Sequence, residues 1–140
     1  MKILLAVDGS PYSKKMLAYL ATHDGVFSPA NEYVVFTAQT ALPSRARSAV
    51  GKEVVDSYYA EESEKVIAPV TKFLMRHGIN AKSISKVGSA GTLIAKMAED
   101  GKFDMVVMGS HGNGAWANLV RGSVATQVLA NCKVPVLMVR

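Results

Sequence analysis

Five short apolar runs, separated by segments with helical periodicity, limit what this 140-residue chain can fold into. Most of the runs are continuous rather than alternating in hydrophobicity, which is typical of parallel strands buried on both faces of a sheet. The third run alternates, so we expect it at a sheet edge. The predicted strands cover residues 2–7, 32–38, 81–87, 103–108 and 134–139.

The segments between these runs carry helix signals. Pro69 lies inside the longest helical pattern and predicts a kink or a break there. Residues 39–53 contain Pro and Gly and have weak periodicity, so they are predicted to form a mobile loop. Four helices are predicted, one with Ser10 as N-cap and Pro11 at its first position that ends near Gly25, and the others at residues 54–77, 92–100 and 123–132.

Strands and helices alternate along the whole chain, which predicts a single α/β domain over residues 1–140. The expected architecture is an open, parallel, five-stranded sheet of order 3-2-1-4-5, with helices on both faces and right-handed crossovers. Ligands of such sheets bind outside the carboxyl ends of the strands, where the strand order reverses.

Composition excludes several classes of function. No apolar stretch reaches the roughly 20 residues that cross a bilayer, and the first run ends at Asp8, too early for a signal peptide. We therefore expect a cytoplasmic protein without a membrane partner. Cys132 is the only cysteine, so no internal disulfide and no cysteine-rich metal site are predicted. His111 has no second His or carboxylate at metal-site spacing, so no other metal site is predicted. The net charge is +5, but no nucleic-acid recognition motif accompanies it, so nucleic acid is not an expected partner.

The segment "MGSHGNGAWANLVRGS", residues 108–123, follows the fourth predicted strand and contains four glycines. Glycine lets backbone N–H groups approach a ligand closely. The segment leads into a predicted helix, whose N-terminus favours an anion, and no acidic residue occurs after Asp104. These features predict a phosphate cradle. Asp8 ends the first strand at the same edge and is expected to contact the ligand, with a local Asx turn as the alternative.

Three phosphate-binding motifs compete for this segment. No Walker A pattern is present. "GNGAWA" matches a dinucleotide fingerprint but lacks the acidic residue about 20 positions later that would hold a ribose, so we reject it. The third pattern, G-x2-G-x9-G-[S/T], is matched in full by Gly109, Gly112, Gly122 and Ser123.

That pattern, with "ILLAVDGSPYSKKML", "VGSAGTLIAKMAEDGKFDMVVMGSHG", "GSVATQVL" and "KVPVLMVR", resembles the ATP-binding branch of the universal stress protein family over nearly the whole chain. The resemblance implies an adenine nucleotide alpha hydrolase-like fold. It implies ATP as the ligand, with AMP and ADP as alternatives and Mg²⁺ as a companion of the nucleotide. The implied function is a nucleotide-dependent regulator or binding module of the stress response. The alternative is a slow ATPase or phosphotransferase, and no catalytic residue is assigned.

The resemblance also implies a role for each matching position. Asp8 would contact the adenine or the ribose, and Ala38 would lie against the adenine, where the family often has valine. Met108 and Gly109 would pass beneath the sugar and phosphates. The backbone N–H groups and the hydroxyl of three residues would bind the phosphates: Gly112, Gly122 and Ser123.

The roles of two residues stay open on the sequence alone. His111 and Arg121 would either touch a phosphate or be solvated.

The last strand is apolar and lies at a predicted edge, where Pro135 limits pairing only at its start. Related proteins pair this strand across a two-fold axis, so the resemblance implies a homodimer with Val136 and Met138 at the contact.

Overall fold

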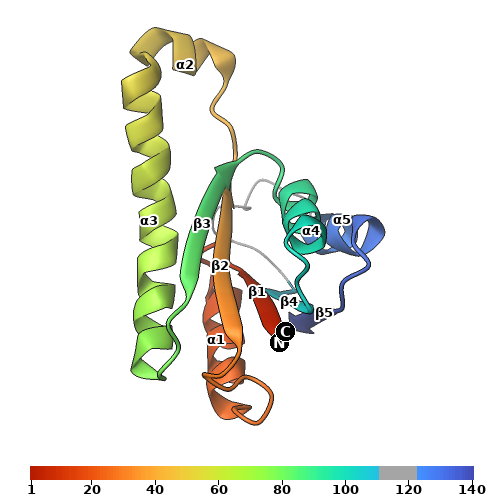
Figure 1. The fold of residues 1–140 in the computed structure, drawn as a ribbon. Helices are drawn as coiled ribbons and strands as arrows, with labels where there is room; N and C mark the ends of the chain where they lie inside the picture. The colour runs from red at the N-terminus through yellow and green to blue at the C-terminus, as the bar shows by residue number, and fades with distance from the viewer. Residues whose placement is uncertain (111–122) are drawn as a thin grey trace.

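The computed structural model describes residues 1–110 and 123–140, apart from the side chain of Ser123. Five parallel strands form one open sheet in the order β3-β2-β1-β4-β5 (Figure 1). This order confirms the predicted fold class, with the third and last strands at the two edges. The strands are β1 (Lys2–Ala6), β2 (Glu32–Gln39), β3 (Lys82–Val87), β4 (Met105–Gly109) and β5 (Val136–Val139).

Helices cover both faces of the sheet (Figure 1). Alternate residues of β1 divide between two apolar clusters: Leu5 packs with α1 and α3, whereas Leu4 packs with α4 and α5. The central strand is therefore buried on both faces, as its continuous apolar run predicts. The helices are α1 (Pro11–Thr22), α2 (Ser44–Val50), α3 (Lys52–Arg76), α4 (Ala90–Asp100) and α5 (Ser123–Asn131).

The predicted loop at residues 39–53 is wrong. Gln39 still belongs to β2, residues Ser44–Val50 form the short helix α2, and Gly51 joins it to α3 with a φ of 85°. No residue of α2 is buried, so the sequence of this helix carries no apolar stripe to reveal it. Figure 1 shows α2 and the first turns of α3 extending beyond the carboxyl ends of the strands.

Two predictions about the helices can be compared with the structure. Helix α3 runs without a break through Pro69, because Ile67, Val70 and Leu74 on both sides of the proline are buried against the sheet. Ser10 is the N-cap residue of α1, but its hydroxyl makes no capping hydrogen bond. Within residues 1–110 and 123–140, no helix combines the length and apolar character needed to span a membrane.

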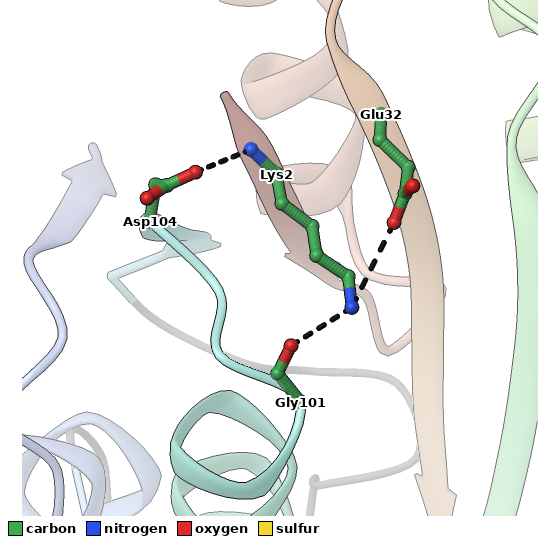
Figure 2. A network of polar contacts seen from close by, with 4 residues as sticks. All are labelled: Lys2, Glu32, Gly101 and Asp104. Carbon is green, nitrogen blue, oxygen red and sulfur yellow. Dashed lines mark hydrogen bonds and ion pairs between the residues drawn. The ribbon is translucent and has the colours of Figure 1, made fainter.

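A polar network joins three elements at the amino ends of the strands (Figure 2). The Nζ atom of Lys2 donates to the carbonyl of Gly101 at 2.8 Å and lies 3.7 Å from the Glu32 carboxylate. The Lys2 backbone N–H donates to Asp104 at 2.7 Å. These contacts hold β1 to β2 and to the turn between α4 and β4, at the edge of the sheet opposite the candidate site.

Candidate functional site

The strand order reverses between β1 and β4, because β1 leads through α1 to β2 on one side and β4 leads through α5 to β5 on the other. In the registers, Ala6 lies opposite Phe36 of β2 and Met108 of β4. Ala38 follows Phe36 by two residues within β2 and therefore lies on the same face, whereas Asp8 lies two residues beyond Ala6, the last residue of β1. Three of the predicted site residues thus lie at the carboxyl edge, with Ala38 and Met108 on the side of α4 and α5.

Asp8 is the polar centre of this edge, and it is only 2% exposed. Its Oδ1 atom accepts two hydrogen bonds, from the Ser10 N–H at 2.9 Å and from the Ser13 hydroxyl at 3.0 Å. The Asp8 N–H donates back to Ser13 Oγ at 3.2 Å. The bond to Ser10 is an Asx turn, so the alternative role considered for Asp8 is present in the structure.

The second carboxylate oxygen of Asp8 is different. Oδ2 is buried and has no hydrogen-bond partner among the described residues. Leaving a buried carboxylate oxygen unpaired costs on the order of 1–3 kcal/mol, and more when it is charged. An Asx turn uses one oxygen only, so it does not account for the second. A ligand with a hydroxyl or amino donor would satisfy it.

The other two residues at this edge are apolar and buried. Ala38 and Met108 are each 1% exposed and belong to the cluster beneath α4 and α5. Neither offers a polar side chain, so together with Asp8 they form an edge with one acceptor and an apolar floor. Such a surface suits a flat ring that carries a polar rim.

Gly109 has a packing role that the sequence analysis missed. A Cβ atom at this position would lie 2.8 Å from Cβ of Tyr12 and 3.3 Å from the Tyr12 backbone. The end of β4 therefore approaches the first turn of α1 so closely that only glycine fits without a shift. This packing is sufficient to explain the glycine, so Gly109 by itself is no evidence for a ligand.

Ser123 opens α5, as predicted, and its backbone is described. The N-terminus of this nine-residue helix follows the carboxyl end of β4 in the chain. Gly112 and Gly122, predicted to bind the phosphates, lie outside the described residues. The same is true of His111 and Arg121.

Sequence reasoning overlooked three buried polar groups near this edge. Ser10 Oγ, Thr37 Oγ1 and Gln39 Nε2 are buried and, like Asp8 Oδ2, lack hydrogen-bond partners in the described part of the chain. Thr37 and Gln39 alternate with Ala38 along β2, so they face the layer of α1 and α3, opposite to Ala38. The sequence feature that could have revealed two of these groups is the pair of polar residues, Thr37 and Gln39, in the otherwise apolar strand "YVVFTAQ".

Within residues 1–110 and 123–140, no group of three His, Cys, Asp or Glu side chains has the arrangement of a metal site. Asp8 is the one acidic side chain among the three site residues described at this edge. The site thus has the features of a binding cradle at the switch point of a doubly wound α/β protein.

Comparison with known proteins agrees with this class. The model of the universal stress protein family matches residues 1–140, and the chain belongs to that family. A universal stress protein of Synechocystis is 30% identical over 139 residues, covering 99% of this chain and 42% of the relative. One of Methanocaldococcus jannaschii is 27% identical over 140 residues, covering 99% of this chain and 81% of the relative. The chain thus spans less than half the length of the Synechocystis protein.

Solved structures share the fold. Hypothetical protein MJ0577 of M. jannaschii superposes with a TM-score of 0.78 at 28% identity, covering 99% of this chain and 94% of that one. An Arabidopsis thaliana family member with AMP bound gives a TM-score of 0.68 at 15% identity, covering 99% and 90%. The Archaeoglobus fulgidus protein in complex with dAMP gives 0.64 at 20% identity, covering 100% and 98%. At these last two identities the likeness concerns the fold.

Proposed function

We propose that this chain binds an adenine nucleotide at the carboxyl edge formed by Asp8, Ala38 and Met108. The observation that carries the proposal is the buried Asp8 carboxylate, with one oxygen paired twice and the other unpaired among the described residues. A ribose hydroxyl or the adenine amino group would donate to Oδ2. Family members with AMP and dAMP bound support an adenine nucleotide as the ligand class.

The phosphates would lie toward the N-terminus of α5, where the backbone N–H groups of the first helical turn and the helix dipole favour an anion. Gly109, Gly112, Gly122 and Ser123 would supply the close backbone approach and a hydroxyl. We propose ATP as the nucleotide, with AMP and ADP as the alternatives and Mg²⁺ as a companion of the phosphates. The absence of acidic residues after Asp104 supports a site for a polyanion.

The role proposed for the protein is a cytoplasmic, nucleotide-dependent regulator of the stress response rather than an enzyme. Efficient phosphoryl transfer needs positioned charge and a base or water-orienting group. Among the three site residues described at this edge, Asp8 is the one acidic group, and the Ser10 N–H and the Ser13 hydroxyl already occupy one of its oxygens. Slow ATP hydrolysis at the same site is the second candidate.

Calorimetric titration with ATP tests the binding proposal. Asp8→Asn keeps the shape of the side chain but replaces the Oδ2 acceptor, which has no partner among the described residues, with a donor. Losing a hydrogen bond to a charged group costs about 1.5–3 kcal/mol, so the affinity should fall about ten- to a hundredfold. Asp24→Asn, an equal charge change at an exposed position after α1, is the matched control and should bind normally. Equal affinity of Asp8→Asn and the unmodified protein would exclude the assigned role of Asp8.

The rate of ATP hydrolysis distinguishes the nucleotide-binding regulator from the ATPase. With ATP and Mg²⁺ supplied, phosphate release should stay well below the roughly 1–100 s⁻¹ that is typical of kinases. A rate within that range that disappears in Asp8→Asn would favour the enzyme.

We also propose a homodimer through β5. The carbonyls of Pro135 and Val139 accept hydrogen bonds from the N–H groups of Val106 and Ser110, on the β4 side. Because alternate residues of a parallel strand address the same neighbour, Val136 and Met138 direct their backbone groups to the open edge. These are the two residues predicted at the contact. Val139, in contrast, is buried under α1, so a lysine there would disturb the core rather than report on the dimer.

A further inference from the structure

Charge is divided sharply along α3. Its first half, residues 52–64, holds five acidic residues and one lysine, whereas its second half, residues 65–76, holds three basic residues and no acidic one. The acidic residues are Glu53, Asp56, Glu61, Glu62 and Glu64, and the basic ones are Lys65, Lys72 and Arg76. Acids near the N-terminus and bases near the C-terminus suit the helix dipole, but that effect is confined to the first and last turns.

The exposed face of α3 also carries apolar side chains. Val54 is 56% exposed and Tyr58 is 43% exposed, and both lie in the first two turns of α3. Spacings of four, seven, seven and four residues connect Val54, Tyr58, Lys65, Lys72 and Arg76, so all five share one face of the helix. This face is apolar at one end and basic at the other, and Glu61 lies on it between Tyr58 and Lys65.

A groove lies beside the basic end, between α3 and α1, with a volume of about 570 Å³. Its apolar walls include Leu17, Val66 and Phe73, and its basic side chains come from Lys14 on α1 and from the second half of α3. No acidic residue lines it among the described residues. Lys65 pairs with Glu62 at 3.0 Å, but no ion pair of Lys14, Lys72 or Arg76 is found within the described ranges.

We propose that the occupant of this groove is the first half of α3 from a second copy of the chain. The two α3 helices would run antiparallel about a two-fold axis near Lys65, so that each exposed, acidic half lies in the basic groove of the other copy. This interface is separate from β5 and does not depend on a bound nucleotide.

Both sides of the proposed contact come from α3, the first half from one copy and the second half from the other. With Lys65 at the axis, Tyr58 lies opposite Lys72 of the partner subunit, and Val54 lies opposite the partner's Arg76. The groove follows α3 from Lys65 to Arg76, about 16 Å, which equals the length from Val54 to Lys65. A two-fold axis makes the same contact twice. Glu61 and Glu62 lie within about one helical turn of the partner's Lys65 and the partner's Lys72, so the acid–base contacts are diagonal ones on each side of the axis.

Light scattering of the assembly at roughly 100 μM protein in low salt tests the interface, because exposed charges are weakly screened there. Reversing the basic half with Lys72→Glu and Arg76→Glu should halve the mass of the assembly. Reversing the acidic half with Glu61→Lys and Glu62→Lys should do the same. The variant with all four changes restores opposite charges across the axis and should regain the original mass.

Lys82→Glu with Lys96→Glu is the matched control, because it makes an equal charge change on exposed residues of β3 and α4 and should leave the mass unchanged. Raising the salt to about 1 M should weaken the unmodified assembly at least tenfold, which is a readout that needs no variant. The proposal is overturned if the reversed variants keep their mass, if the fourfold variant fails to recover it, or if assembly is indifferent to salt.

Discussion

At the scale of single residues, buried groups decide how the molecule packs and reacts. Gly91 lies where α4 packs tightly against α5, since a Cβ atom there would overlap the Gln127 side chain, lying 2.5 Å from its Cβ. Gly91→Ala should therefore push the helices apart and lower the free energy of unfolding by about 1–3 kcal/mol. Urea unfolding followed by circular dichroism measures this change. An unchanged urea midpoint would show that α4 and α5 accommodate the added methyl group without loss of stability.

Cys132 gives a second prediction at this scale. The thiol is half-buried against the cluster under α5, and burial raises its pKa above the ordinary value. A raised pKa means less thiolate at any given pH, and the thiolate is the reactive form. Iodoacetamide at about pH 8 should therefore alkylate the folded protein several-fold more slowly than the urea-unfolded chain. Equal rates in the two states would contradict this account of the cysteine.

At the scale of elements, Lys2 connects β1, β2 and the C-terminus of α4. Its Nζ atom donates to Gly101, the C-cap of α4, where a cation also complements the helix dipole. Lys2→Met keeps the aliphatic stem and should cost about 1 kcal/mol of stability, because the pairing with Glu32 is partly exposed to water. ATP affinity should not change, since the network lies at the opposite edge of the sheet. Chemical unfolding and calorimetry on the same preparation check both outcomes.

Sequence reasoning succeeded for elements with one strong pattern. The strands of the doubly wound sheet have apolar runs, and their order was predicted correctly. It failed for α2, which has no buried residue, and at Pro69, where the packing of Ile67 and Val70 overrides the preference of one residue. Convergence of Asp8, Ala38 and Met108 followed from strand order. The lack of a partner for Asp8 Oδ2 among residues 1–110 and 123–140 did not, because it depends on which oxygen Ser10 and Ser13 select.

At the scale of the whole molecule, the proposed β5 dimer rests on backbone groups at the open edge. Met138→Pro removes an N–H that points away from β4, so it should break the pairing between copies and leave the sheet bonds of β4 and β5 in place. The mass in solution should halve while the far-ultraviolet circular dichroism stays the same. Retention of the full mass by a folded Met138→Pro protein would exclude β5 as the contact.

The central claim is that an adenine nucleotide completes the hydrogen bonding of Asp8, and a crystal structure of the protein with ATP tests it most directly. The account predicts a ribose hydroxyl or the adenine amino group at hydrogen-bond distance, about 2.7–3.2 Å, from Asp8 Oδ2. It also predicts the ring against Ala38 and Met108 and the phosphates toward the start of α5. Nucleotide bound elsewhere, or bound at this edge with Oδ2 still unpaired, would contradict it.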